Sequence, residues 1–281
     1  MRYRLLLLLV LSWVTSASAA EVTAVTEPTP NPGTALITGS DRGIGLALTR
    51  EFLSRGWQVI ATCRDPEKAT DLKSLASEHS TVSIEKLDVS DDAAIDALVA
   101  KLKDRPIDAL VNNAGVTGDF DAQTLAGLDA NEFSRVMRVN SYAPLRVSAA
   151  FLKLVAASKQ RKIIAISSGY GSISSAEKIA SYGYPAAYFY AMSKAALNMG
   201  MREFAFEAAH NQVITVLLAP GAVDTDMQRG IRERMAKMGK PISLPTITPE
   251  ASAHSMVLVI EQLKPDQNAK FLSRDGSEIP W

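Results

Sequence analysis

Short apolar runs alternate with longer amphipathic segments from Thr34 to the end of the chain. A short apolar run between turn residues is typical of a buried strand, and a longer segment with apolar positions three or four apart is typical of a helix. The predicted strands are Ala35–Thr38, Gln58–Thr62, Val82–Leu87, Ala109–Val111, Lys162–Ile166, Val213–Leu218 and Lys270–Leu272, and the predicted helices are Gly43–Arg55, Glu67–Glu78, Asp91–Lys103, Asn131–Ala157, Ala187–Ala209 and Pro249–Leu263. This alternation predicts an α/β fold, a doubly wound parallel sheet of about seven strands with helices on both faces.

The N-terminal segment has a different pattern. Arg2 and Arg4 precede an apolar run, Leu5–Val14, and the small residues Thr15–Ala19 follow it, which is typical of a signal peptide cleaved after Ala19. The run is shorter than the ~20 residues that cross a bilayer, but an uncleaved run that continues to residue 20 would serve as a weak membrane anchor. We therefore expect a signal peptide or anchor at 1–19, a flexible Thr- and Pro-rich linker at 20–33 and one folded domain at 34–281. The protein is then exported to the periplasm or beyond, or membrane-tethered, and it is cytoplasmic only if the start is misassigned.

Composition excludes several classes of protein. The chain has 281 residues, 47% of them hydrophobic and 21% charged, which is enough to bury a sizeable core. Thirty basic and thirty acidic residues balance, and no basic run is present, so nucleic acid is not an expected partner. Cys63 is the only cysteine and the three histidines are scattered, so we expect neither an internal disulfide nor a metal site.

A glycine-rich turn follows the first predicted strand, where the chain reads Thr38-Gly39-Ser40-Asp41-Arg42-Gly43-Ile44-Gly45. Gly39 permits a tight turn, Gly43 lets the backbone approach a pyrophosphate, and Gly45 allows the helix to pack closely on the strand. The start of that helix presents free N–H groups and a positive dipole end. The turn therefore favours a dinucleotide-binding site. The alternative is an ordinary glycine turn that only connects a strand to a helix.

Further motifs follow in order along the chain: Asn112-Asn113-Ala114-Gly115 after the fourth strand, Asn140 in the long fourth helix, Ser168 after the fifth strand, Tyr190 and Lys194 in a Y-x-x-x-K pattern, and Pro220-Gly221 after the sixth strand. With these motifs the chain resembles the classical short-chain dehydrogenases/reductases from Thr34 to Trp281. The resemblance implies a Rossmann-type fold that binds NAD(P). The tract Val59–Pro66, the tract Ser193–Met199 and the ending Asp275–Trp281 resemble the carbonyl-reductase-related branch that includes Sniffer and C-factor.

The end of the second strand bears on the choice of cofactor. An NAD-specific site of this type places an acidic residue there, whereas this chain has Cys63 followed by Arg64. Arg64 and Arg42 could hold a 2′-phosphate by charge-assisted hydrogen bonds, so we expect NADP(H) rather than NAD(H), unless both are merely surface charges. The resemblance further assigns cofactor contacts to Gly39, Ser40, Asp41, Arg42, Gly43, Ile44, Gly45, Arg64, Asp88, Val89, Asn112, Ala114, Gly115, Tyr190, Lys194, Pro220, Gly221, Val223 and Thr225, and makes Asn113 structural.

Reduction of a carbonyl group needs a proton donor, and a phenol with a pKa of ~10 must become more acidic to act as both acid and base. Lys194 lies one helical turn after Tyr190, where its charge favours the phenolate. The pattern is common on ordinary helices, so it gains its meaning from the resemblance. The resemblance implies that Tyr190 is the acid, that Ser168 donates a hydrogen bond to the substrate oxygen, and that Asn140 holds a water linking Lys194 to solvent.

Two segments near this site are unusual. Ser172–Ala187 lengthens the distance between Ser168 and Tyr190, and we expect it to loop out over the mouth of the site. Asp226–Thr248 is rich in methionine and favours a flexible substrate lid, with a plain helix packed on the surface as the alternative.

The leading hypothesis is an NADPH-dependent reductase of a small or hydrophobic carbonyl compound, reversible as an alcohol dehydrogenase. A non-catalytic NADP(H)-binding sensor is the second, because a fold alone does not establish an activity. A sugar-nucleotide epimerase or dehydratase is the third. A homodimer through the two long helices stays open.

Overall fold

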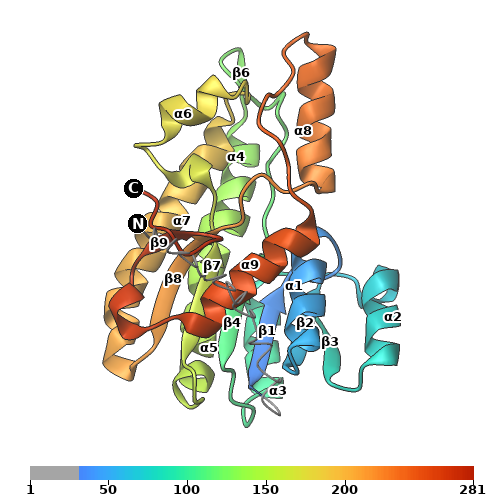
Figure 1. Ribbon diagram of the computed structural model, residues 1–281, viewed down its shortest axis with the longest axis vertical. Coiled ribbons are helices and arrows are strands. Elements are labelled where there is room, and N and C mark those ends of the chain that lie inside the picture. The colour runs from blue at the N-terminus through green and yellow to red at the C-terminus, as the bar shows by residue number, and fades with distance from the viewer. Residues whose placement is uncertain (1–31) are drawn as a thin grey trace, which may run out of the picture.

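Residues 32–281 are described by a computed structural model (Figure 1), and the predicted signal peptide and most of the predicted linker lie outside these residues. A seven-stranded sheet forms the centre, with the strands in the order β3-β2-β1-β4-β7-β8-β9 and every neighbouring pair parallel. The strands are β1 (Thr34–Thr38), β2 (Gln58–Cys63), β3 (Val82–Lys86), β4 (Ala109–Asn112), β7 (Lys162–Ile166), β8 (Ile214–Ala219) and β9 (Phe271–Ser273). The predicted doubly wound sheet is confirmed.

Helices cover both faces of this sheet (Figure 1). One hydrophobic core forms where α1, α2 and α9 meet the sheet, and it includes Phe52, Leu72 and Met256. The other forms where α3, α5 and α7 meet the opposite face, and it includes Phe151 and Met201. The bounds of these helices are α1 (Gly43–Ser54), α2 (Thr70–Glu78), α3 (Asp92–Lys101), α5 (Ala143–Ala156), α7 (Tyr188–Ala208) and α9 (Pro249–Gln262).

One predicted helix has an irregular turn inside it. The segment predicted as the single helix Asn131–Ala157 consists of α4 (Ala130–Met137), a π turn at Arg138–Tyr142, and α5. In this turn the amide of Ala143 bonds to the carbonyl of Arg138, five residues back instead of four. A π turn adds one residue to a helical turn, often at a functional site, and the apolar periodicity of the sequence did not reveal it.

Two smaller elements were not predicted, a hairpin of β5 (Gln123–Thr124) and β6 (Gly127–Leu128) and the helix α6 (Ala176–Ser181), and a third, the helix α8 (Asp226–Lys237), was expected only as the alternative to a lid. Each follows the carboxyl end of a strand, namely β4, β7 and β8. They stand at the upper end of the molecule in Figure 1. The carboxyl edge of the sheet therefore carries most of the structure that the sequence pattern missed.

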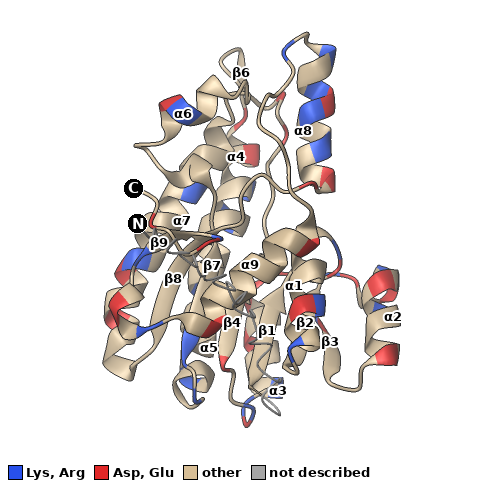
Figure 2. Cartoon of the chain, viewed as in Figure 1, with Lys and Arg blue, Asp and Glu red and all other residues tan. Residues whose placement is uncertain are grey.

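The helix α8 resolves the two interpretations of Asp226–Thr248 in part. It carries a dense run of charged residues on its outer side (Figure 2), while Ile231 and Met235 pack with Ile242, Phe120 and Tyr184 in a small separate cluster. The segment thus contains a packed surface helix, and its motion as a lid stays a prediction. Within residues 32–281, no helix combines the length and the apolar character needed to cross a membrane.

The two phenylalanines near the end of α7 test this packing. Phe204 is 8% exposed and lies in the core beneath α7, whereas Phe206 is 52% exposed. Phe204→Ala should lower the free energy of unfolding by about 3 kcal/mol, because it removes buried apolar surface and leaves a cavity. Phe206→Ala, the matched control, should change it by less than about 0.5 kcal/mol in the same denaturant titration. Equal losses from both variants would contradict the orientation of α7.

Candidate active site

The glycine-rich turn between β1 and α1 has the geometry of a phosphate-binding loop. Gly39 has a φ of +67°, a conformation that favours glycine. A β-carbon at position 45 would lie 2.0 Å from the carbonyl oxygen of Gly39, so only glycine permits this close packing of helix on turn. The residue before α1, Arg42, makes no side-chain cap. The free N–H groups at the start of α1 are therefore available to an anion.

This turn forms one wall of a cleft of about 700 Å³ at the carboxyl edge of the sheet. The volume lies within the range of small-molecule and cofactor sites, roughly 300–1,000 Å³. The predicted cofactor residues that line it are Gly39, Asp41, Arg42, Gly43, Ile44, Gly45, Arg64, Asp88, Val89, Ala114, Gly115, Tyr190, Lys194, Pro220 and Thr225. The structure thus brings together residues from five strand ends, as a nucleotide site between the halves of such a sheet requires.

Two exposed arginines from the glycine-rich turn and the end of β2 line the cleft. Arg42 and Arg64 both line it, and the buried Cys63 lies beside Arg64 at the end of β2. Partial burial of Asp88 raises the pKa of its carboxyl, but hydrogen bonds from Ser90 and the charge of Arg64 outweigh burial and leave this pKa below its usual value. Asp88 is therefore ionised at neutral pH, an acceptor suited to an amino group such as that of adenine.

Four predicted cofactor residues do not line this cleft. Ser40 is buried, and its hydroxyl donates to the carbonyl of Ile37, so it fixes the turn from behind. The amide of Asn112 donates to Ser148 of α5 at 2.9 Å, which directs it away from the cleft. Val223 forms a β-bridge with Ile247, and a β-carbon built on Gly221 would lie 3.8 Å from the side chain of the same residue.

Asn113 ties the ends of β1 and β4 together, which agrees with its predicted structural role. Its side-chain amide donates to the carbonyls of Thr38 and Gly39, both at 2.9 Å. In return, the hydroxyl of Thr38 accepts from the backbone amides of Asn113 and Ala114, at 2.9 and 3.0 Å. These bonds hold the glycine-rich turn against the loop that follows β4.

Tyr190 and Lys194 lie in the first turns of α7 and line the cleft, as predicted. Lys194 is 5% exposed, and its ammonium donates to the carbonyl of Ile166 at 2.8 Å. The ammonium lies 5.8 Å from the ring centre of Tyr190. Burial lowers the pKa of Lys194 to about 8. An ammonium has three donors, so this side chain can also bind hydroxyl groups of a ligand in the cleft.

The expected direction of the Tyr190 pKa is wrong for the chain as described. Burial raises the pKa of the Tyr190 phenol, and a hydrogen bond with Ser168 offsets this only in part. Lys194 was expected to lower the phenol pKa below its usual value, whereas burial moves this pKa in the opposite direction. The phenol therefore keeps its proton at neutral pH and is ready to donate it.

Ser168 lies just beyond the end of β7, at the start of the 3₁₀ turn Gly169–Gly171. Its hydroxyl accepts from the amide of Tyr170 at 3.3 Å, and it is the hydrogen-bonding partner of Tyr190. Ser168 itself does not line the cleft, although its neighbour Ser167 does, and its predicted hydrogen bond to a substrate oxygen stays a prediction.

Asn140 lies in the π turn and is fully buried. Its amide oxygen accepts from the amide of Val116 at 2.9 Å, and its amide nitrogen donates to the carbonyl of Val116 at 2.7 Å and to the hydroxyl of Ser193 at 3.0 Å. The side chain thus joins the loop after β4 to α7. The predicted role in holding a water for Lys194 stays a prediction.

Sequence reasoning missed a buried pair behind Ser168. The hydroxyl of Ser167 donates to the side-chain oxygen of Asn198 at 2.5 Å, and the nitrogen of Asn198 donates to the carbonyl of Gly171 at 3.0 Å. Asn198 lies one turn after Lys194, so these bonds fasten both ends of the turn that carries Ser168 to α7. Asn198 was read only as part of a family tract, because no spacing rule connects an asparagine to a serine 31 positions earlier.

Aromatic rings lead from Tyr190 towards α8. The ring of Tyr170 packs edge-on against two other rings, with its centre 5.6 Å from the ring centre of Tyr190 and 6.0 Å from that of Tyr184. The hydroxyl of Tyr184 accepts from Gln228 of α8 at 2.7 Å. The segment Ser172–Ala187 therefore contacts α8. Its position over the mouth of the site stays a prediction.

A second cavity of about 670 Å³ lies beside this segment. It is lined mainly by apolar and aromatic side chains of α8, of the hairpin and of the loops around them, including Phe120, Leu125, Tyr184, Tyr188, Met235 and Met238. No group of acidic, histidine or cysteine side chains suited to a metal ion lies within residues 32–281.

Comparisons with known proteins agree with this geometry. The model of the short chain dehydrogenase family matches residues 33–236. An uncharacterized oxidoreductase of Schizosaccharomyces pombe is 35% identical over 253 residues, which is 87% of this chain and 96% of that protein. The C-signal protein of Myxococcus xanthus is 35% identical over 176 residues, 63% of this chain and 93% of that protein.

Two solved structures are similar over most of the chain. The carbonyl reductase Sniffer of D. melanogaster matches with a TM-score of 0.75 and 28% identity, covering 88% of this chain and 99% of that one. The NADPH-bound carbonyl reductase from chicken fatty liver matches with a TM-score of 0.76 and 32% identity, covering 88% of this chain and 98% of that one.

Replacing the buried ammonium tests the electrostatics of the cleft. The pKa of Lys194 is about 8 in the folded chain and 10.5 in the unfolded one. Below pH 8 the amine is charged in both the folded and the unfolded chain. In this range the free-energy cost of burying the charge in the folded chain is at its largest. Lys194→Met should therefore raise the free energy of unfolding by about 1–3 kcal/mol at pH 7. This gain should shrink between pH 8 and 10.5 and vanish above, where the amine is neutral in both states.

The exposed Lys153 of α5 supplies the control for this experiment. Lys153→Met should change the free energy of unfolding by less than about 0.5 kcal/mol at each pH. A Lys194→Met variant that is less stable than the unchanged chain at pH 7 would show that the ammonium is not strained by burial.

Proposed function

Because the chain belongs to the short-chain dehydrogenase family, we propose that it reduces a small or hydrophobic carbonyl compound with NADPH, reversibly as an alcohol dehydrogenase. Membership makes the chain an oxidoreductase of this family. The placement beside Sniffer and C-factor is confirmed by the matches to Sniffer and to the C-signal protein. The observation that carries the proposal is the meeting of Tyr190 and the buried Lys194 at the wall of one cleft, with Ser168 as the hydrogen-bonding partner of Tyr190.

The residues of the cleft fit a nicotinamide dinucleotide. The uncapped start of α1, the tight turn at Gly39 and the approach permitted by Gly43 suit a pyrophosphate. Asp88 suits the adenine amino group, and the spare donors of Lys194 suit the ribose hydroxyls next to the nicotinamide. When bound, NADPH supplies the hydride that the carbonyl carbon accepts. Relatives are solved with NADP or NADPH bound, which supports the same cofactor here.

Three side chains then serve proton transfer, two that line the cleft and Ser168, which bonds to Tyr190. The phenol of Tyr190 keeps its proton at neutral pH and gives it to the carbonyl oxygen as negative charge develops there. The hydroxyl of Ser168 donates a hydrogen bond to the same oxygen and stabilises that charge. The ammonium of Lys194 stabilises the phenolate left behind, and the alcohol departs. In the reverse direction the phenolate accepts the proton of the alcohol.

The arginines favour NADPH over NADH. Arg42 and Arg64 are exposed cations that line the cleft, and both can hold the 2′-phosphate of NADPH. Cys63 stands where an NAD-specific site has a carboxylate, so no charge at that position repels a phosphate.

The substrate is a hydrophobic carbonyl compound. The aromatic rings of Tyr170 and Tyr184 lead from Tyr190 towards the apolar cavity beside α8. A ligand with an apolar or aromatic body would bury that surface against these rings while its carbonyl group faces Tyr190.

Loss of the phenol tests the reaction. The mature domain from Thr34 should oxidise NADPH in the presence of at least one compound of a panel of aldehydes, ketones and quinones, followed by nicotinamide absorbance. Tyr190→Phe should lower kcat by about 10³-fold or more, because the proton donor is lost, while the Kd for NADPH stays within about threefold. Turnover retained by Tyr190→Phe would exclude Tyr190 as the acid. NADPH binding without turnover by the unchanged domain would support the sensor function.

Removal of the two arginines tests the cofactor preference. Arg42→Ala with Arg64→Ala should raise the Kd for NADPH by about 10–100-fold, since two charge-assisted hydrogen bonds to the 2′-phosphate are lost. NADH, which has no 2′-phosphate, is the internal control, and its Kd should change by less than about threefold. Titration of each nucleotide by fluorescence gives both values. An equal loss of affinity for both nucleotides would contradict a role in selecting the phosphate.

A further inference from the structure

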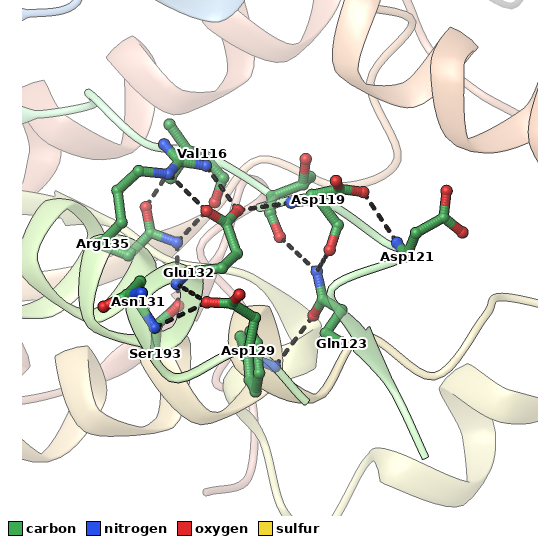
Figure 3. Close-up of polar contacts among 12 residues, drawn as sticks. Val116, Asp119, Asp121, Gln123, Asp129, Asn131, Glu132, Arg135 and Ser193 are labelled. Atoms are coloured by element: carbon green, nitrogen blue, oxygen red, sulfur yellow. Dashed lines mark hydrogen bonds and ion pairs between the residues drawn. The ribbon is translucent and has the colours of Figure 1, made fainter. Parts of the chain in front are cut away.

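The loop after β4 crosses from the cleft to the start of α7 and is held by an unusual number of polar contacts. Figure 3 shows Gln123, Glu132 and Asp129 around the segment from Val116 to Asp121. Gln123 is 1% exposed, and its side chain is fully used. Its nitrogen donates to the carbonyls of Thr117 and Asp119, both at 3.1 Å. Its oxygen accepts from the backbone amide of Phe189 at 3.0 Å.

The amide of Phe189 is one of the donors at the start of α7 that have no partner within the helix. The residue that precedes the helix is Ala187, which has no side chain able to accept a hydrogen bond, and no local side chain caps α7. By contrast, α3, α4, α8 and α9 are capped by the Asp or Thr that precedes each of them. For α7 the acceptor comes from Gln123, 66 positions earlier in the sequence.

This contact lies next to the reacting side chain. Phe189 immediately precedes Tyr190, and Ser193, which Asn140 binds, follows it by three residues. The loop after β4 is thus fastened to α7 on both sides of Tyr190, by Gln123 before it and by Asn140 after it. The same loop lines the cleft at Thr117 and Gly118, so one segment contacts both the nucleotide site and the helix of the proton donor.

We propose that Gln123 is a positioning residue for Tyr190, which it orients by capping α7 and by tying the first turn of this helix to the loop that lines the cleft. The proposal rests on the proposed function for the reaction that Tyr190 serves. Gln123 acts through the backbone and does not touch the reacting atoms. Without its oxygen the first turn of α7 frays, water reaches the phenol, and the pKa that burial raises falls back towards its ordinary value.

Three variants separate this role from general stability. Gln123→Met keeps the length of the side chain and removes every hydrogen bond. Gln123→Glu keeps an oxygen that accepts from Phe189, where a negative charge suits the start of a helix, but it loses both donor bonds to the loop at Thr117 and Asp119. Asp129→Ala is the matched control, because Asp129 caps the neighbouring α4 through the amides of Asn131 and Glu132 and does not contact α7.

Amide hydrogen exchange and the phenol pKa are read without any substrate. Gln123→Met should speed exchange in the first turn of α7 by about tenfold, since a typical cap is lost there. It should also lower the pKa of Tyr190, measured as the difference between absorbance titrations with and without Tyr190→Phe. Gln123→Glu should restore part of both values, since it keeps the cap on α7 but not the bonds to the loop, and Asp129→Ala should change neither.

Turnover gives the third measurement. Gln123→Met should lower kcat by about tenfold or more, because a small displacement of a reacting group is costly, with the Kd for NADPH within about threefold. Its pH profile should lose activity at a lower pH than that of the unchanged chain. Unchanged exchange and phenol pKa in Gln123→Met, or equal effects from Asp129→Ala, would overturn the proposal. A chain that reduces none of the tested compounds counts against the proposed function alone, since exchange and titration still decide the role of Gln123.

Discussion

Burial of the Lys194 ammonium is the constraint on which the rest of the site depends. A charge removed from water costs free energy, and the one protein hydrogen bond to Ile166 compensates for only part of it, which is why the pKa of Lys194 falls to about 8. The same desolvated surroundings raise the pKa of Tyr190. The site therefore combines a phenol that holds its proton with an ammonium that gains when a negative charge forms beside it. Both properties come from one cause, the packing of α7 against the carboxyl ends of the strands.

Such a site needs a rigid frame, and buried amides supply much of it. Asn140, Gln123 and Asn198 each join α7 to a segment that follows a strand, and each uses both its donor and its acceptor. An amide can satisfy both kinds of backbone group without adding a charge to the interior. Buried polar groups that are fully paired favour a single arrangement of the elements around them. These amides thus hold α7, and with it the desolvated ammonium of Lys194, in one place.

The sequence predicted the parts of the molecule that local patterns determine. The seven strands of the main sheet and the glycine-rich turn were found because apolar runs and glycine spacing are properties of neighbouring residues. Tyr190 and Lys194 were found through a motif, and the structure places them together. By contrast, Gln123 and Asn198 bond to residues far away in the sequence. A motif covers only a few neighbouring residues, so no motif could reveal these two side chains. The π turn at Asn140 and the inward orientation of Ser40 and Asn112 likewise depend on packing, which a pattern of residue types does not encode.

The central claim is that this cleft directs a hydride to a carbonyl carbon while the protein supplies the proton. Its most direct test uses NADPH that carries deuterium at both positions of the nicotinamide C4, incubated with a hydrophobic aldehyde or ketone and the domain from Thr34. Mass spectrometry and NMR of the alcohol locate the label. The account predicts one deuterium, bound to the carbinol carbon, in every product molecule formed from unlabelled substrate. An alcohol without deuterium at that carbon, or with the label shared with solvent, would contradict direct hydride transfer in this cleft.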